Sequence, residues 1–436
     1  MQTNFTAEQL ADPHVAESET ILRKCVHCGF CTATCPTYVV LGNELDSPRG
    51  RIYLIKDMLE NGRAADTEVV THIDRCLSCL ACVTTCPSGV DYMHLVDHAR
   101  VHIEKTYKRP FMERMTRGIL AAVLPYPGRF RLALNLAKIG RPFKGLMRVP
   151  SLKPFAAMLA LAPRQIPAPS PFARPAVHAA KAEKRGRVAI LTGCAQPVLD
   201  PAINEATIKL LTRLGVEVVA PAGEVCCGSL VHHMGREEQA LASARANVDV
   251  WTREIENGGL DAIIITASGC GTTIKDYGHM LRLDSAYAEK AARISALAKD
   301  ITEYLATLDL PSHMPRGVTV AYHSACSMQH GQRITMAPKQ LLKAAGFTVR
   351  EPAEGHLCCG SAGTYNIMQS DISAALKARK VRNIEATKPH VIATGNIGCI
   401  TQIGTGTAIP ILHTVELLDW AYGGDVPQKL RDLPLP

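Results

Sequence analysis

Two short runs of the sequence each place four cysteines within eleven residues and end in proline. They are CVHCGFCTATCP at residues 25–36 and CLSCLACVTTCP at residues 76–87, with forty residues between the last cysteine of one and the first of the other. The spacing C-x2-C-x2-C-x3-C-P is one with which cysteine thiolates hold iron–sulfur clusters. Three closely spaced thiolates bind one cube, and the fourth, redirected by the proline, reaches the neighbouring cube. The runs therefore predict two [4Fe–4S] clusters.

Crossed ligation assigns each cluster three cysteines from one run and one from the other. The expected ligand sets are Cys25, Cys28, Cys31 and Cys86 for the first cluster, and Cys76, Cys79, Cys82 and Cys35 for the second. Zinc is the competing metal, but a tetrahedral zinc site gains nothing from a third, evenly spaced cysteine. The long gap between the runs favours a helical ferredoxin-type domain, expected at residues 1–104, over a small ferredoxin.

Eight further cysteines form two sets of four with matching spacing. The sets are Cys194, Cys226, Cys227 and Cys270, then Cys326, Cys358, Cys359 and Cys399. In both sets 32 residues separate the first cysteine from the adjacent pair, and 43 or 40 separate the pair from the last cysteine. Each pair is followed by glycine. The spacing predicts an internal duplication of about 125 residues, two Cys-Cys-Gly (CCG) repeats.

Each repeat alternates β-branched segments with helical segments, which predicts parallel sheets covered by helices on both faces. Three of the four cysteine positions fall at or just beyond a predicted strand end, where open parallel sheets bind ligands. Adjacent cysteines on a strand point to opposite faces, so a pair that shares one site needs a loop, which Gly228 and Gly360 permit. We expect a cysteine-rich redox site in each half, or one site shared between them. The alternative is that these are structural thiols inherited by duplication.

Five histidines lie near these cysteines in the sequence. They are His232, His233, His323, His330 and His356. A histidine beside a metal site more often packs or orients a ligand than binds the metal itself. We therefore expect none of them to be a direct ligand.

The whole chain is expected to be an α+β multidomain protein. The mainly helical two-cluster domain at 1–104 is followed by a basic, Pro-rich connector at 105–185 and a duplicated α/β cysteine-rich domain with parallel sheets, at 186–310 and 316–424. Between Lys105 and Arg187 there are eighteen Lys and Arg against two acids, a net charge of +16, while the remaining chain sums to −8. The connector is either a solvated spacer with packed helices or a surface for an acidic partner or anionic lipid. Because the basic charge is confined to it, nucleic-acid binding is not expected.

Sixteen cysteines without a recognisable export signal indicate metal or redox work in a reducing compartment, because disulfides are rare there. The N-terminal residues lack a charged start and an apolar run, and no stretch of about 18 apolar residues predicts a membrane span. The expected location is cytoplasmic, with peripheral contact to the inner face of the cytoplasmic membrane through the connector as an open alternative.

In combination, these motifs resemble the electron-transfer subunits of membrane-associated flavoprotein dehydrogenases. The stretches that carry the resemblance are CVHCGFCTATCPTY, SPRGRIYLIK, GCAQP, TASGCG, HLCCGSAGTY and NIGC, spread over nearly the whole chain. Such subunits serve glycolate oxidase, anaerobic glycerol-3-phosphate dehydrogenase and relatives of heterodisulfide reductase. The chain is most similar to the iron–sulfur subunits of glycolate oxidase (glycolate dehydrogenase).

The resemblance implies that two FAD-containing partner subunits oxidise glycolate, or D-lactate, to the 2-oxo acid. This chain would pass the electrons toward the respiratory chain, with a quinone as the expected acceptor. No G-x-G-x-x-G dinucleotide motif opens a helix after a strand, so FAD is expected only in the partners and no catalytic residue here. The alternatives are a thiol or heterodisulfide reductase, a subunit of another flavoprotein dehydrogenase, and a structural zinc protein.

One departure from the resemblance concerns the last cysteine of each repeat. The CCG repeats of heterodisulfide reductase commonly end in C-x-x-C and hold non-cubane clusters. Here the last cysteines stand alone, in CGTT at Cys270 and CITQ at Cys399. Four thiols in each half suit a four-ligand cluster, and the cluster type in the repeats is left open.

Overall fold

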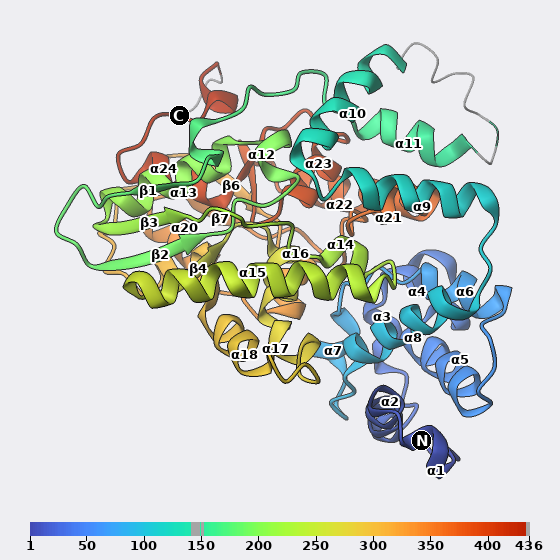
Figure 1. The fold of residues 1–436 in the computed structure, drawn as a ribbon. Helices are drawn as coiled ribbons and strands as arrows, with labels where there is room; N and C mark the ends of the chain where they lie inside the picture. The colour runs from blue at the N-terminus through green and yellow to red at the C-terminus, as the bar shows by residue number, and fades with distance from the viewer. Residues whose placement is uncertain (141–148, 150–151, 433–436) are drawn as a thin grey trace.

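The computed structural model describes residues 1–140, 149 and 152–432. Helices of the N-terminal part lie at the lower right of Figure 1, and the two sheets of the C-terminal part lie at the left and centre. The helices of the connector lie at the upper right, above the N-terminal helices. Among the described residues, no helix combines the length and the apolar composition needed to cross a membrane.

Eight helices form the N-terminal part and surround one apolar core. They are α1 (Ala7–Leu10), α2 (Pro13–Lys24), α3 (Phe30–Thr34), α4 (Pro36–Leu41), α5 (Pro48–Glu60), α6 (Thr67–Asp74), α7 (Ala81–Thr85) and α8 (Tyr92–Thr106). Leu22, Ile55, Ile73 and Leu95 are fully buried in this core. Helix α5 begins at Pro48, and the Ser47 side chain caps it by accepting from the backbone N–H of Gly50.

The connector is more structured than the sequence pattern indicates. It contains α9 (Phe111–Val123), α10 (Pro127–Gly140), α11 (Lys153–Leu161), the 3-10 turn η4 (Pro171–Ala173) and strand β1 (Ala176–His178). The predicted helical patches are confirmed as α9 and α10, while residues 141–148 and 150–151 lie outside the described residues. The Pro-rich stretch expected to be an extended linker ends in β1, which pairs antiparallel with the next repeat's strand β3.

Two sheets follow, one in each CCG repeat. The first contains β2 (Gly186–Ile190), β3 (Val216–Ala220), β4 (Ala262–Ile265) and β5 (Ala298–Asp300), in the order β1-β3-β2-β4-β5. The second contains β6 (Thr319–Tyr322), β7 (Thr348–Arg350), β8 (Val391–Thr394) and β9 (Ile411–His413), in the order β7-β6-β8-β9. Apart from the added β1, every pairing is parallel, as predicted.

Helices cover both sheets. In the first repeat they are α12 (Gln196–Leu199), α13 (Ala202–Arg213), α14 (Ser229–His232), α15 (Glu237–Gly258), α16 (Ser268–Lys275), α17 (Tyr277–Met280), α18 (Ala288–Leu297) and α19 (Ile301–Leu305). In the second they are the π-helical turn η5 (Ser327–Gly331), α20 (Ala337–Ala344), α21 (Tyr365–Met368), α22 (Ser370–Glu385), α23 (Ile397–Gly404), α24 (Thr414–Ala421) and the 3-10 turn η6 (Gln428–Leu430). The equal strand order of the two sheets confirms the duplication.

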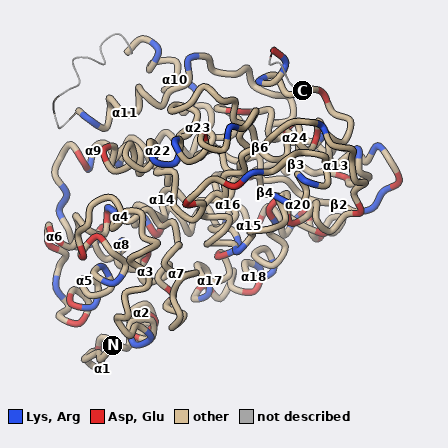
Figure 2. Tube along the Cα trace, turned by 180° about the vertical axis from the view of Figure 1, so that it is seen from behind, with Lys and Arg blue, Asp and Glu red and all other residues tan. Residues whose placement is uncertain are grey.

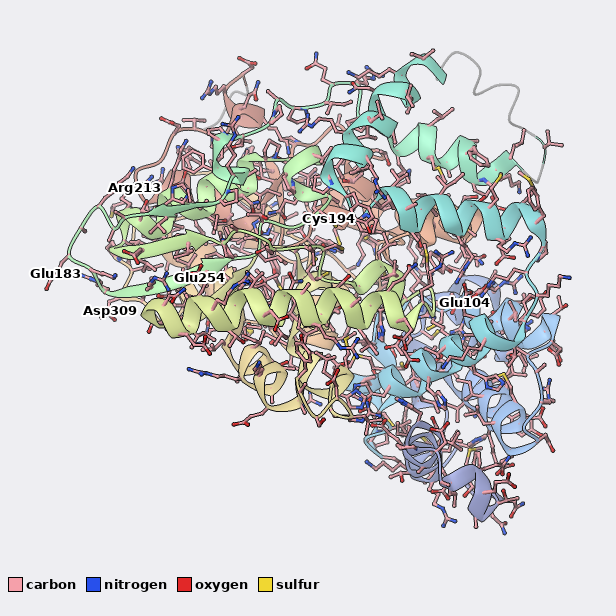
Figure 3. All side chains as sticks on the ribbon, in the orientation of Figure 1. Glu104, Glu183, Cys194, Arg213, Glu254 and Asp309 are labelled. Carbon is pink, nitrogen blue, oxygen red and sulfur yellow. The ribbon has the colours of Figure 1, made fainter. Side chains whose placement is uncertain are left out.

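Strand order decides where the cysteines lie. In both sheets the first strand of the repeat lies between the second and the third strand. The connections to the second and to the third strand therefore run toward opposite edges of the sheet, and a crevice opens between them at the carboxyl ends of the strands. Figure 3 shows Glu183, which precedes β2, and Cys194, which follows it, at opposite ends of the first sheet. Cys194 lies on the side of the sheet that faces the N-terminal helices.

The two repeats and the N-terminal helices contact one another directly. Ser268 Oγ and Ser327 Oγ lie 2.7 Å apart and join the repeats. His94 Nε2 lies 2.9 Å from Asp276 Oδ1 of the first repeat, and Tyr365 Oη of the second donates to the Arg75 carbonyl at 3.0 Å. The N-terminal part therefore sits against both repeats.

Candidate iron–sulfur and cysteine-rich sites

The first ligand set surrounds a cavity at the surface of the N-terminal part. Cys25, Cys28, Cys31 and Cys86 all line it, together with Cys82. Cys25 follows α2, Cys31 lies in α3 and Cys86 follows α7, so the two runs meet where α3 packs on α7. The cavity thus brings three cysteines of the first run together with Cys86 and Cys82 of the second run, a donor set that fits an iron–sulfur cluster.

Left-handed backbone positions shape these ligand loops. Gly29 has φ +83° directly after Cys28, and Leu80 has φ +60° directly after Cys79. Such a conformation suits glycine and strains leucine, so the second run holds a strained residue between its second and third cysteines. The two runs accordingly adopt equivalent turns before the short helices α3 and α7.

A buried arginine lies beside the second ligand set. Arg51, 1% exposed, donates from Nη1 to Cys35 Sγ at 3.8 Å and from Nη2 to Thr37 Oγ1 at 3.0 Å. Burial lowers the pKa of Arg51, but the charges of Cys76, Tyr92 and Cys35 outweigh burial and raise it. The guanidinium therefore stays cationic and offsets negative charge at this site.

The second set is otherwise enclosed. Tyr92 Oη donates to Cys76 Sγ at 3.7 Å. Burial raises the pKa of Cys79 and of Cys82 well above the usual thiol value, and neighbouring cysteines add to the rise. Metal ligation requires thiolates, so a cationic iron–sulfur core is the kind of group that these buried thiols could hold in deprotonated form.

The first repeat brings its four cysteines together at the carboxyl edge of its sheet. Cys194 Sγ and Cys226 Sγ lie 3.5 Å apart, and the Cys227 side chain is hydrogen-bonded to Cys270. The side chains of Cys226 and Cys227 also contact each other, so the four thiols form one continuous group.

The second repeat repeats this geometry. Cys326 Sγ lies 3.6 Å from Cys358 Sγ, and Cys359 Sγ lies 3.5 Å from Cys399 Sγ. The pair follows β7 in a loop whose Gly360 has φ +88°. Each half thus has a complete set of four thiols of its own, which favours two separate sites over one shared site.

The second repeat's set lies against the N-terminal part. Cys79, from the second ferredoxin-type set, belongs to the same buried cluster as Cys358, with Leu77 and Tyr365, and Cys326 packs against that cluster. Because these thiols lie close together, charge on Cys326 raises the pKa of Cys79, and charge on Cys79 raises the pKa of Cys358. These two cysteine sets are therefore neighbours although they are more than 240 residues apart in the chain.

Four of the five histidines near the cysteines in the sequence have roles apart from the thiols. His232 and His233 contact the buried Asp97 of α8. His330 Nδ1 lies 2.7 Å from Thr84 Oγ1, and its Nε2 lies 3.1 Å from the carbonyl of His356. These contacts hold the repeats on the N-terminal part.

The exception is His323, which lies close to Cys359 and Cys399. One ring nitrogen of His323 and the two Sγ atoms all fall within 4.8 Å of one another. A second buried group nearby is Lys380, 2% exposed, whose ammonium donates to the Glu354 carbonyl at 2.7 Å. Burial lowers the pKa of Lys380, and the thiols of the second repeat oppose that effect.

Sequence reasoning did not single out Arg51 or Lys380. Arg51 interrupts the apolar face of α5, three and four residues before Leu54 and Ile55, and an arginine on a buried helix face is a recognisable signal. Lys380 lies in a helix rich in Lys and Arg, where nothing distinguishes it from its exposed neighbours. Only the folded structure reveals it.

Family models match two regions of the chain. The "4Fe-4S dicluster domain" matches residues 21–90, which include both ferredoxin-type runs. The "Cysteine-rich domain" matches twice, at residues 188–275 and 320–404, and so covers the cysteine sets of both repeats. The N-terminal part therefore carries a 4Fe-4S dicluster domain, followed by a duplicated cysteine-rich domain.

One solved structure has a similar fold. It is that of a hypothetical protein from Helicobacter pylori, which aligns with a TM-score of 0.54 over 96% of this chain and 74% of that chain. The sequences are only 10% identical, so the likeness concerns the fold alone.

Curated relatives extend over nearly the whole chain. It is 42% identical over 429 residues to the glycolate oxidase iron-sulfur subunit of Escherichia coli (strain K12), covering 97% of this chain and 99% of that protein. It is 32% identical to the probable glycolate oxidase iron-sulfur subunit of Bacillus subtilis (strain 168), covering 92% and 94%. Lactate utilization protein A of Bacillus licheniformis is 26% identical over 53% of this chain. The chain belongs to the family of glycolate oxidase iron–sulfur subunits.

Proposed function

We propose that this chain is the electron-transfer subunit of a glycolate oxidase (glycolate dehydrogenase) complex. The observation that carries the proposal is the packing of Cys79, in the second ferredoxin-type set, against Cys358 of the second repeat. Bound iron–sulfur clusters accept and release single electrons. A series of adjoining cysteine sets in one chain is the arrangement that such a relay requires.

The ligand sets are those given by crossed ligation. Cys25, Cys28, Cys31 and Cys86 hold one [4Fe–4S] cluster, and Cys76, Cys79, Cys82 and Cys35 hold the other. The cysteines of the two CCG repeats hold further redox centres. The lining of the first cavity by Cys86 next to three cysteines of the first run supports this assignment. The same proposal divides the chain into the two-cluster domain at 1–104, the connector at 105–185, and the two CCG repeats at 186–310 and 316–424.

The exposed end of the relay lies at the first cluster. All sixteen cysteines are described, and Cys28 is the exposed one among them. Val26 and Phe30 beside it are 66% and 63% exposed, so an apolar rim surrounds this edge of the cavity. A flavoprotein subunit that docks there would cover the rim and bring its flavin close to the first cluster.

Substrate oxidation takes place outside this chain. Two FAD-containing partner subunits oxidise glycolate, or D-lactate, to the 2-oxo acid, and the electrons leave toward a quinone of the respiratory chain. The cytoplasm is the location that fits this role, with the connector as the surface that contacts the membrane. Lys and Arg positions on α10 and α11 are seen in Figure 2, and neither helix contains an acidic residue, which supports such a contact.

The test is reduction of the chain by substrate. The complex, purified without oxygen, is mixed with glycolate and freeze-quenched, and the EPR spectrum of the reduced clusters is recorded. We expect glycolate to reduce the clusters in the complex and to leave them oxidised in the isolated chain. Phe30→Glu should slow reduction in the complex at least about tenfold by placing a charge in the docking rim, while Phe111→Glu provides a control at an exposed aromatic side chain on α9, outside the lining of this cavity.

Two results would argue against the proposal. Clusters that stay oxidised in the intact complex with glycolate and with D-lactate would exclude the relay. Turnover of a heterodisulfide by the isolated chain with an artificial electron donor would instead indicate a thiol reductase.

A further inference from the structure

The two CCG repeats share their cysteines but differ in the side chains that surround them. Three residues before the first cysteine, the second repeat has His323 and the first repeat has Leu191. Twenty-two residues after the first cysteine of the pair, the second repeat has Lys380 and the first repeat has Val248. Leu191 and Val248 are both buried in an apolar cluster. At these two positions the second repeat therefore has a histidine and a lysine where the first repeat has apolar side chains.

The fold directs His323 toward the thiols of the second repeat. It directly follows β6, and its backbone N–H donates to the Ala393 carbonyl of β8 at 2.8 Å, which fixes it at the carboxyl edge of the sheet. Cys399 lies in the first turn of α23, which follows the same β8 strand, and Cys359 follows β7. The imidazole and the two thiols thus converge from three neighbouring strands.

The His323 side chain has an unsatisfied nitrogen. Its Nε2 is buried and has no hydrogen-bond partner, and the residue is 2% exposed. A buried imidazole nitrogen without a partner costs free energy, because it has lost its hydrogen bonds to water and gained none in the protein. Neutral imidazole is a common metal ligand, and a metal at this position would satisfy the nitrogen.

We propose that His323 Nε2 is a direct ligand of the iron centre in the second repeat. The ligand set is then mixed, with the thiolates of Cys326, Cys358, Cys359 and Cys399 and one imidazole. The first repeat, which has Leu191 at the matching position, binds its centre through thiolates alone. This inference rests on the proposed function in that it takes the second repeat to hold an iron centre.

A mixed set would distinguish the two repeats in electron transfer. The imidazole would be an additional, neutral ligand of the second centre, and histidine ligation is one of the features that tune the reduction potential of an iron–sulfur centre. The second repeat also adjoins Cys79, so the centre with the imidazole ligand is the one next to the ferredoxin-type clusters.

The test is pulsed EPR on protein labelled with 15N-histidine, in the state in which the centre of the second repeat is paramagnetic. We expect one strongly coupled histidine nitrogen in the native chain. His323→Cys supplies a thiolate in place of the imidazole, and should retain iron while the nitrogen coupling disappears. His330→Gln, in the same loop region but bonded to Thr84, is the matched control and should retain the coupling.

Iron content assigns the signal to a repeat. The double variant Cys358→Ser/Cys359→Ser should lose iron together with the nitrogen coupling, whereas Cys226→Ser/Cys227→Ser should lose iron and retain the coupling. The inference is overturned if the native chain shows no histidine coupling, or if the Cys358/Cys359 variant keeps all its iron. Neither result affects the reduction of the ferredoxin-type clusters by glycolate, so failure here is distinguishable from failure of the proposed function.

Discussion

Arg51 shows how one side chain can set the properties of a cluster site. Its buried guanidinium donates to Cys35 Sγ and, from Nε, to the His72 carbonyl at 2.7 Å. It also forms an ion pair with Asp46, with 3.6 Å between Nη2 and Oδ1. A fixed positive charge stabilises the reduced, more negative form of a cluster and so raises its reduction potential. Asp46 is also bonded to His72 and Arg75, so it stays paired if Arg51 is changed.

Replacing Arg51 tests this electrostatic effect. Arg51→Met should lower the reduction potential of the second cluster by about 60 mV, which corresponds to about tenfold in the one-electron equilibrium. Arg51→Lys keeps the charge and should lower it much less. An EPR-monitored potentiometric titration measures both, and equal potentials in the native chain and in Arg51→Met would refute the effect.

Crossed ligation makes a prediction for single cysteines. Cys35→Ser should disturb the cluster held mainly by Cys76, Cys79 and Cys82, although Cys35 belongs to the other run. Cys86→Ser is the reciprocal variant and should disturb the cluster in the surface cavity. Iron content and the EPR spectrum of each reduced variant provide the comparison. If each substitution affected the cluster of its own run, crossed ligation would be wrong.

The loops after β3 and β7 show why each cysteine pair is followed by glycine. At Gly360, φ is +88°, and an added Cβ would lie 2.7 Å from the Ser373 carbonyl oxygen. At Gly228, φ is +83° and the nearest backbone atom, the Ala240 carbonyl oxygen, would lie at 3.1 Å. Both positions combine a left-handed conformation with close packing on the following helix, which leaves room only for glycine.

Gly360→Ala tests this restriction. We expect a loss of about 1–3 kcal/mol in the free energy of unfolding, because alanine is strained at positive φ and its Cβ meets the backbone. Gly355→Ala is the control in the same loop, since an added Cβ there meets only the Pro352 carbonyl oxygen at 3.7 Å. Thermal unfolding without oxygen measures the difference. Equal stability of the two variants would contradict the account of the loop.

Strand and helix prediction from the sequence succeeded where the apolar pattern was long. The segments around β2, β3, β4, β6, β7 and β8 were predicted, with the helices that follow them. Three-residue strands are marginal for such prediction: β7 was predicted from its β-branched run, whereas β1, β5 and β9 were not and are defined by pairing with a neighbour. Their existence depends on the assembled sheet.

The cysteine sets could be predicted as groups because regular spacing is visible in a sequence. Arg51, His323 and Lys380 could not be assigned to the sites in this way, because their proximity to the thiols arises from tertiary packing. His323 was noted in the sequence and expected to lie outside the ligand set. Its burial without a partner for Nε2, visible only in the structure, is the reason for the new assignment.

In the whole molecule, the N-terminal part is held on the first repeat by a group of charged side chains. His94 Nδ1 lies 2.8 Å from Asp91 Oδ2 and its Nε2 lies 2.9 Å from Asp276 Oδ1. The His94 ring also stacks on His279, with 3.5 Å between centroids, and His279 contacts Glu17 at 2.6 Å. Burial lowers the pKa of His94, but the two aspartates outweigh it and raise the pKa to about 10.

This group makes stability depend on pH. Because the folded pKa of His94 is raised, its stabilising effect is complete below the unfolded pKa of about 6.5 and is lost as the pH rises through about 10. His94→Gln should lower the free energy of unfolding by about 1.5–3 kcal/mol at pH 6, through loss of charged hydrogen bonds, and much less near pH 10. His102→Gln, on the same helix, is the control. A deficit in His94→Gln that is independent of pH would contradict this role.

The central claim is that this chain carries several iron–sulfur centres in series. The most direct measurement is the iron and acid-labile sulfide content of the chain purified without oxygen, combined with the EPR spectrum of the reduced protein. The account predicts at least about eight iron and eight sulfide per chain, from two [4Fe–4S] clusters, and spectra of interacting reduced clusters. Fewer than about four iron per chain, or a colourless protein that contains zinc, would contradict it.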